Sequence, residues 1–296
     1  MEFTEPIMRP PQEAHSLLLR ATEGCSYNAC NFCYVSRGYQ FRAVSPEYLE
    51  QEILRYKPFF PADTNVYLTG SNPFALPTET LQTYIATLRR HFPLFHELSM
   101  QSRIDDITRK TPEELQLLAS LGLTHLYIGV ENGNDQTLKF MNKGYTAAEA
   151  INALHLLDEA KISYTNFYVL GLGGQGLGKQ CGLDTAKMFN QVHPRRITTT
   201  GMTIFKDTPL AQMVAAGTFK EPSEREKIEE LGIFLENLTI DTFYDGVHYL
   251  NPLNYRFQTG NTQEKTKVLK DIQDVLNEYS TKELELMVNR KMMVSL

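Results

Sequence analysis

The sequence lacks several features that would assign it to other classes of protein. It has no tryptophan, only four cysteines and no run of about 18 uninterrupted apolar residues, so we expect no membrane-spanning helix. Residues 1–16 lack the apolar core of a signal peptide. The four cysteines are too few and too clustered for a disulfide framework. We therefore expect a cytoplasmic protein whose thiols are reduced.

Clusters of basic residues are missing as well. The net charge is -6, and lysines and arginines are interspersed with acidic residues along the whole chain. A protein that binds nucleic acid usually carries a basic patch or stripe, because the phosphates must be neutralised. No nucleic-acid partner is therefore expected.

What is present is typical of a globular protein. The chain has 296 residues, of which 42% are hydrophobic and 22% are charged. This length allows one large domain with a tail, and it is long enough to bury a sizeable core.

Strand-like apolar runs alternate with helical patterns six times along the first 220 residues. Ser45, Thr111 and Thr146 are expected to cap helices, and the last two each stand three residues before a glutamate. Strict alternation implies parallel strands joined by right-handed crossovers. The predicted fold class is therefore α/β, a partial (β/α)6 TIM-like barrel. The expected strands are residues 17–21, 65–69, 97–102, 125–130, 164–170 and 197–204.

Three parts of the chain are expected from this pattern. Residues 1–16 form an N-terminal arm, residues 17–220 form the barrel, and residues 221–296 form a mainly helical extension over the barrel mouth. Within the extension, residues 241–261 are predicted to be an irregular connection. Active sites of such barrels lie at the carboxyl ends of the strands, where the loops converge.

The loop after the first strand contains Cys25, Cys30 and Cys33. Clustered thiolates bind soft metals, which here means zinc, copper or an iron-sulfur cluster. Structural zinc normally takes four protein ligands, but the other candidates, His15 and Cys181, are distant in sequence. Three thiolates on a four-iron four-sulfur (4Fe-4S) cluster leave one iron open. An open iron is what the amino and carboxylate groups of S-adenosylmethionine (SAM) require.

The stretch Cys-Ser-Tyr-Asn-Ala-Cys-Asn-Phe-Cys-Tyr resembles the signature of the radical SAM superfamily. The commonest form has three residues between the first two cysteines, whereas this chain has four. That longer spacing resembles the one found in a poorly characterised subgroup of the superfamily. The resemblance covers about residues 17–205. It implies that the three cysteines hold a 4Fe-4S cluster and that SAM is the second cofactor.

The resemblance also implies a set of SAM contacts. Phe32 stands where the superfamily places an apolar residue near the adenine, and Gly70-Ser71-Asn72-Pro73 stands where a backbone turn contacts the methionine amino group. Glu131 matches a glutamate that binds SAM in the superfamily. Arg103 can pair with the carboxylate of SAM. For several of these positions core packing or a turn is an alternative. The implied SAM contacts are Phe32, Gly70, Ser71, Ser102, Arg103, Glu131, Gly171, Leu172 and Met202.

A weaker set of candidates concerns the substrate. His248 and Asn251 form a His-x-x-Asn stretch similar to one in the same subgroup, and Tyr34 follows the cysteine loop. These side chains can bind substrate or relay a proton, although a structural role for His248 is the competing interpretation. Cys181 is interpreted as a small buried residue, with a hydrogen-atom donor as the alternative.

The resulting hypothesis is a radical SAM enzyme that cleaves SAM reductively and acts on a small or medium organic substrate. It implies an external one-electron reductant, flavodoxin-like or ferredoxin-like. Two alternatives stay open at this point. One is a haem- or tetrapyrrole-binding chaperone related to coproporphyrinogen oxidase, and the other is a metal or electron-transfer protein that does not use SAM.

Overall fold

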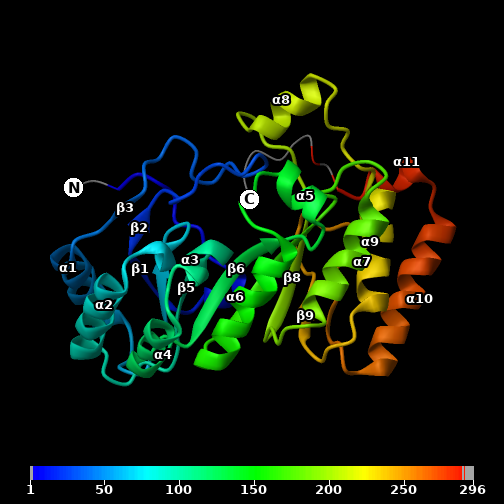
Figure 1. Cartoon of the computed structure of the whole chain (residues 1–296). Coiled ribbons are helices and arrows are strands. Elements are labelled where there is room, and N and C mark those ends of the chain that lie inside the picture. The colour runs from blue at the N-terminus through cyan, green and yellow to red at the C-terminus, as the bar shows by residue number, and fades with distance from the viewer. Residues whose placement is uncertain (1–2, 289, 291–296) are drawn as a thin grey trace. The chain divides into compact units, whose positions relative to one another are not determined.

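The computed structural model describes residues 3–288 and 290 (Figure 1). The chain divides into two compact units. Unit 1 comprises the described residues up to 28, together with 35–129 and 155–164. Unit 2 comprises 29–34, 130–154 and the described residues from 165 onward.

Unit 1 contains a parallel sheet with the strand order β1-β4-β5-β6. Most residues of these strands are buried, which is the pattern of a parallel sheet covered on both faces. The last two residues of β6 belong to unit 2. The strands are β1 (Leu17–Arg20), β4 (Val66–Thr69), β5 (Leu98–Ser102) and β6 (His125–Glu131), with a separate small pair formed by β2 (Thr22–Glu23) and β3 (Arg42–Ala43).

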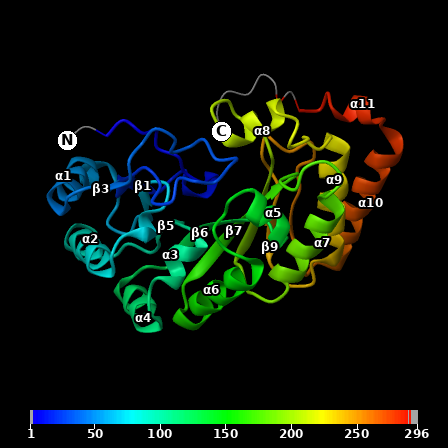
Figure 2. The same ribbon diagram turned by 45° about the horizontal axis from the view of Figure 1, so that its top comes forward.

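The long helices of unit 1 follow the strands, and α2 packs beside both α1 and α4 (Figure 2). Their amino termini are formed as expected. The Ser45 hydroxyl accepts a hydrogen bond from the Tyr48 amide, and Thr111 and Glu114 form a capping box. The helices are α1 (Pro46–Tyr56), α2 (Thr78–His91), α3 (Ile104–Thr108) and α4 (Pro112–Leu121), with 3-10 turns at Pro11–Glu13, Lys57–Phe59 and Pro73–Ala75.

Unit 2 contains the strand order β7-β8-β9-β10. β7 and β8 are parallel, β9 is parallel to β8, and β10 returns antiparallel to β9. The prediction of an irregular connection over residues 241–261 was wrong in part, because β9 and β10 lie within it. The strands are β7 (Ser163–Leu170, its first two residues in unit 1), β8 (Arg196–Gly201), β9 (Phe243–Asp245) and β10 (Arg256–Gln258).

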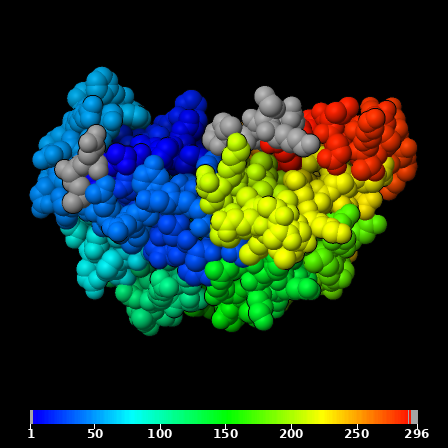
Figure 3. Space-filling model, turned by 90° about the horizontal axis from the view of Figure 1, so that it is seen from above, coloured from blue at the N-terminus to red at the C-terminus, as the bar shows by residue number. Residues whose placement is uncertain are grey.

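The helices of unit 2 include a layer in which α9 packs against both α7 and α10 (Figures 1 and 2). α8 and the residues after it lie on the outer surface (Figure 3). Capping boxes at Ser223 and Ser280 begin α9 and α11. The helices are α5 (Asp135–Phe140), α6 (Ala147–Ala160, shared with unit 1), α7 (Gly178–Phe189), α8 (Pro209–Ala215), α9 (Glu224–Asn237), α10 (Thr262–Glu278) and α11 (Thr281–Leu284).

The six predicted strand-helix repeats are therefore all present, beginning at β1, β4, β5, β6, β7 and β8. Between residues 3 and 288, the structure has no helix that is both long enough and apolar enough to cross a membrane.

Gly70, at the end of β4, occupies a position that only glycine fits. Its φ is +138°, and a Cβ atom there would lie 2.0 Å from the Thr22 hydroxyl oxygen and 2.9 Å from the Thr22 carbonyl oxygen. We expect Gly70→Ala to lower the free energy of unfolding by about 2–4 kcal/mol, because backbone strain and a steric clash add together.

Gly38 is the matched control, since its φ is +85° and no atom lies within 4 Å of its Cβ position. Gly38→Ala should cost only the strain, about 1 kcal/mol. Urea denaturation measures both changes, and equal losses would contradict the steric account.

Candidate functional site

The cysteine loop begins in unit 1 and continues into unit 2. Cys25 belongs to unit 1, whereas Cys30 and Cys33 belong to unit 2. All three are thiols outside any disulfide, and all three are partly exposed. Cys181 is also a thiol, but it is buried within α7. The loop thus presents three accessible sulfur atoms from nine consecutive residues.

Within unit 1, the buried side chain of Asn72 holds the start of this loop through Ser26. Its Oδ1 accepts a hydrogen bond from the Ser26 amide at 3.0 Å, and its Nδ2 donates to the Ser26 Oγ at 2.7 Å. Nδ2 also donates to Asp106 Oδ2 at 2.8 Å, and the Arg103 amide donates to the same oxygen at 3.0 Å. The turn after β4 and the end of β5 are therefore joined to the residue that follows Cys25.

Arg103, which directly follows β5, lies in the same network. Its Nη2 is 3.0 Å from Asp105 Oδ1, and its guanidinium lies 3.7 Å from the centre of the Tyr27 ring. The Ser102 hydroxyl donates to the Arg103 carbonyl at 2.9 Å. Burial raises the pKa of Asp106, although the Asn72 amide and the Arg103 backbone oppose that rise. The network thus stacks a cation on the ring of Tyr27, which follows the first cysteine by two residues.

Glu5 is a contributor that the sequence did not reveal. Its buried carboxylate accepts a hydrogen bond from the Gly24 amide at 2.7 Å and another from the Ser36 hydroxyl at 2.6 Å. Ser71, a predicted SAM contact, is hydrogen-bonded to Ser36 and donates to Glu5 at 3.4 Å. The N-terminal arm therefore fixes the residue before Cys25.

Within unit 2, the second half of the loop is held by backbone contacts. The Asn31 amide donates to the Met141 carbonyl at 2.9 Å, and the Leu210 amide donates to the Asn31 carbonyl at 2.9 Å. Phe32 packs against a hydrophobic cluster that includes Leu172 and Met202. Three of the residues expected near the adenine, from three different elements, are thus brought together.

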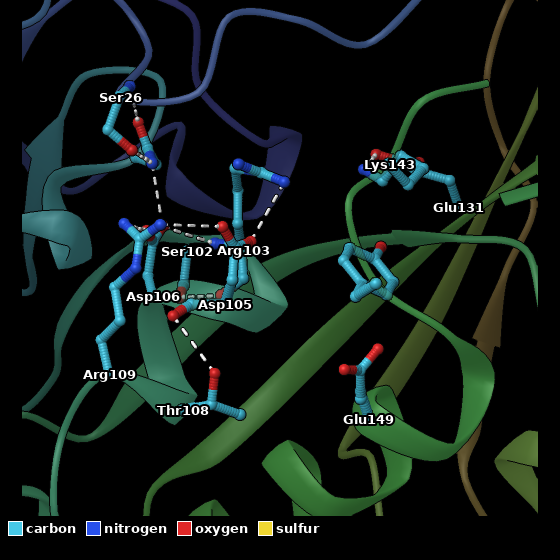
Figure 4. Close-up of polar contacts among 12 residues, drawn as sticks. Ser26, Ser102, Arg103, Asp105, Asp106, Thr108, Arg109, Glu131, Lys143 and Glu149 are labelled. Carbon is cyan, nitrogen blue, oxygen red and sulfur yellow. Dashed lines mark hydrogen bonds and ion pairs between the residues drawn. The ribbon is translucent and has the colours of Figure 1, made fainter. Parts of the chain in front are cut away.

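Glu131 ends β6 with a φ of +67°, in the left-handed region that side chains other than Asn and Asp rarely adopt. Its Oε1 lies 3.5 Å from Nζ of Lys143 (Figure 4). Lys143 is buried, and its Nζ lies 5.7 Å from the centre of the Phe32 ring. Lys143 was not among the predicted residues. An unusual backbone conformation together with an ion pair to a buried lysine is a frequent mark of a functional position.

Gly171 opens the glycine turn after β7, with a φ of +85°. Its carbonyl accepts a hydrogen bond from the Gly174 amide at 3.1 Å, which closes the turn. The turn borders a cavity of about 360 Å³ in unit 2. The cavity is lined by Gln136, Thr137, Phe140, Leu172, Gly173, Gly174, Gln175, Leu177, Gly217, Thr218, Phe219 and Lys220.

The side chains proposed for the substrate make several structural contacts. The Asn251 amide donates to the carbonyl oxygens of Gly246 at 2.6 Å and Thr199 at 2.9 Å, which anchors the segment before β10. Nδ1 of His248 accepts a hydrogen bond from the Leu250 amide at 3.2 Å. Burial lowers the pKa of His248, so its ring is largely neutral at pH 7.

The two remaining candidates also lie in unit 2. The Tyr34 ring packs on Phe205, with ring centres 4.1 Å apart. Cys181 Sγ is 3.3 Å from the Thr137 hydroxyl, and burial raises the pKa of the thiol to about 12. Cys181 is therefore a protonated thiol at neutral pH, as expected of a small core residue.

The donor set fits an iron-sulfur cluster. Three accessible thiols within nine residues offer three sulfur ligands, and in a cubane each binds a different iron. Such sulfurs need not converge on one point as they would around a single ion. In the part of the chain that the structure describes, no three His, Cys, Asp or Glu side chains gather closely enough to hold one metal ion.

Curated relatives match the chain at low identity. A tRNA-2-methylthio-N(6)-dimethylallyladenosine synthase of Hahella chejuensis is 25% identical over 191 residues, which is 59% of this chain and 41% of that protein. The synthase of Shewanella pealeana is 23% identical over 287 residues, covering 89% of this chain and 58% of the relative. The chain thus spans about half the length of the curated relatives it matches.

Solved structures share the fold. Coproporphyrinogen III oxidase (HemN) from Escherichia coli superposes with a TM-score of 0.56 at 20% identity, covering 75% of this chain and 52% of that one. Methylornithine synthase (PylB) gives a TM-score of 0.54 at 11% identity and covers 93% of this chain and 86% of that one. These likenesses confirm the predicted fold class, a partial TIM-like α/β barrel.

The family model described as "Radical SAM superfamily" matches residues 19–175, which include the cysteine loop, Asn72, Arg103, Glu131 and the glycine turn. The chain therefore belongs to the radical SAM superfamily, whose enzymes use a 4Fe-4S cluster and SAM.

Proposed function

We propose that this chain cleaves SAM reductively and uses the resulting 5'-deoxyadenosyl radical on a small or medium organic substrate. The observation that carries the proposal is the loop with three accessible thiols inside the segment that matches the family. In this assignment, Cys25, Cys30 and Cys33 hold the cluster. The cluster supplies a single electron and an open iron for the amino acid end of SAM.

The residues around the loop divide the binding of SAM among them. Phe32, Leu172 and Met202 form the apolar surface against which the adenine packs, in line with their shared cluster. Gly171 opens the turn that carries Leu172 at the edge of that surface.

The polar end of SAM is assigned to the predicted contacts Gly70, Ser71, Ser102, Arg103 and Glu131. Support comes from the network in which Arg103 and the turn after β4 meet at Asp106. Further support is the pairing of Glu131 with the buried Lys143 in unit 2, which keeps both charges in place. A guanidinium suits the carboxylate of the ligand, and a carboxylate suits its ammonium group.

Reductive cleavage would require one external electron, which a flavodoxin-like or ferredoxin-like donor would supply to the cluster that Cys25, Cys30 and Cys33 would hold. With that electron the bond between the SAM sulfur and the 5'-carbon would break and methionine would leave. The 5'-deoxyadenosyl radical would then take a hydrogen atom from the substrate, giving 5'-deoxyadenosine and a substrate radical. A low-potential electron donor is available in the cytoplasm, where we place the protein.

The substrate is proposed to contact His248, Asn251 and Tyr34.

Two alternatives to a small or medium organic substrate keep specific support. Structural likeness to coproporphyrinogen III oxidase favours a tetrapyrrole ligand, including the chaperone alternative. The names of the curated relatives point to tRNA, although the net charge of -6 speaks against a large polyanion.

The test is an anaerobic incubation of the reconstituted protein with SAM and dithionite, followed by chromatography. We expect 5'-deoxyadenosine and methionine in equal amounts, and none when SAM or dithionite is omitted. Parallel incubations with haem and with bulk tRNA separate the alternatives. Haem absorption changes without any 5'-deoxyadenosine would favour the chaperone, and a mass change confined to tRNA would overturn the small-substrate assignment.

A further inference from the structure

Glu230 of α9 is a fully buried acid that no step above uses. It lies in the C-terminal extension, yet its side chain reaches the end of β7. Oε1 accepts a hydrogen bond from the Tyr168 hydroxyl at 2.6 Å, and Oε2 accepts one from the Gly171 amide at 2.8 Å. Both oxygens of the carboxylate therefore accept hydrogen bonds from β7 and from the turn that contains Gly171 and Leu172.

The helix that bears Glu230 approaches this closely because α7 has glycines where the two helices meet. A Cβ atom on Gly182 would lie 2.6 Å from the Glu230 carbonyl oxygen, and one on Gly178 would lie 3.2 Å from Oε2. Any larger residue at Gly182 would push α9 away from the turn. The contact between Glu230 and Gly171 is therefore built into the packing of α7 against α9.

We propose that Glu230 is a positioning residue for SAM, which acts by fixing the Gly171 backbone at the adenine surface. The inference rests on the proposed function, because the role of the turn in holding SAM comes from it. The hydrogen bond from the Gly171 amide orients the first peptide group of the turn. Without it, Gly171 could leave its φ of +85°, because glycine adopts several backbone conformations at little cost. The hydrogen bond from the Tyr168 hydroxyl holds the Glu230 carboxylate in its own position. The C-terminal extension thereby contributes to a binding surface that it does not itself line.

The protonation state of Glu230 matters for this role. Burial raises its pKa to about 8, although the two hydrogen bonds and Lys227 oppose that rise. The titratable groups that face it are Tyr168 on β7, Cys181 on α7, and Glu226 and Lys227 on α9. As a carboxylate, Glu230 offers a full acceptor to both donors, whereas the protonated form keeps only one. The turn should therefore be held most firmly above about pH 8.

The raised pKa of Glu230 also determines how the free energy of unfolding changes with pH. The folded chain holds the Glu230 proton up to about pH 8, whereas the unfolded chain releases it near the ordinary pKa of 4.5. The folded state binds more protons between these values, so the free energy of unfolding falls as the pH rises across that window. In Glu230→Gln this contribution is absent, and the melting temperature should depend less steeply on pH there.

The experiment measures SAM affinity of the anaerobically reconstituted protein by equilibrium dialysis, for the wild type and for Glu230→Gln. Glutamine can accept from only one of the two donors, so we expect the Kd to rise about tenfold above the pKa of Glu230 and to change less below it. Comparing the two proteins at each pH removes the titration of SAM itself. Tyr244→Phe is the control, because it also removes a buried hydrogen bond in unit 2, the one between the Tyr244 hydroxyl and Thr199 of β8 at 2.6 Å.

A second measurement needs no cofactor. Hydrogen exchange of the Gly171 amide should be at least about tenfold faster in Glu230→Gln and unchanged in Tyr244→Phe. Equal exchange rates and equal SAM affinity in Glu230→Gln and wild type would overturn the inference, as would an equal loss of affinity in Tyr244→Phe. A wild type that binds no SAM would instead overturn the proposed function, and the exchange rate of Gly171 would still decide whether Glu230 positions the turn.

Discussion

Cys30→Ala is expected to produce no detectable 5'-deoxyadenosine, a loss of at least about a thousandfold. In the proposed site each thiolate would bind one corner of the cluster, so a missing sulfur would leave an iron that water or buffer can remove. Cys30 is partly exposed and lies outside the hydrophobic core, so its truncation should leave the fold intact. Iron and acid-labile sulfide should fall with the activity, while the circular dichroism spectrum stays that of the wild type.

Cys181→Ala is the matched control for this experiment. It also removes one thiol, but from a buried position in α7 next to Thr137. We expect a modest loss of stability and a full complement of iron. Iron lost equally from Cys181→Ala and Cys30→Ala would contradict the assignment of the loop as the cluster site.

The second large effect is expected for Asn72→Ala. The change removes the hydrogen bonds to the Ser26 amide, the Ser26 hydroxyl and Asp106 from a fully buried position. Buried groups left without partners cost about 1–3 kcal/mol each, so we expect the free energy of unfolding to fall by about 3 kcal/mol. The pKa of Asp106 should rise further, because the Asn72 amide now lowers it.

The consequence for function separates this variant from an ordinary core mutation. Because Asn72 fixes the residue after Cys25, its loss should slow cluster assembly and raise the rate at which chelators remove iron. Tyr84→Phe is a suitable comparison, since it deletes a buried hydrogen bond to the Val44 carbonyl in the same unit. Should both variants release iron at the wild-type rate, the network would be structural only.

Much of the fold could be predicted because its signals are local. The buried run of β4 and the capping boxes at Thr111 and Ser223 depend on residues that are close in sequence. β9 and β10 were missed because three residues are too few to display an alternating pattern. The cysteine loop is equally local, since its chemistry follows from the spacing of three thiols.

The residues that support the site could not be predicted, because their contacts are distant in sequence. Glu5 meets Gly24 across 19 residues, and Glu230 meets Gly171 across 59. Nothing in the pattern around Lys143 marks it as the partner of Glu131, since a lysine after a helix is normally solvated. Only the folded chain shows that these acids and this cation are buried and paired.

The left-handed backbone at Glu131 has a consequence for attempts to stabilise this protein. Glycine or asparagine would adopt that conformation more easily and would relieve the backbone strain at this position. Either variant would also remove the carboxylate that lies 3.5 Å from the ammonium of the buried Lys143, which costs stability in turn. Relief of backbone strain and retention of the ion pair are thus expected to oppose each other at this single residue, so replacing it should gain little heat resistance.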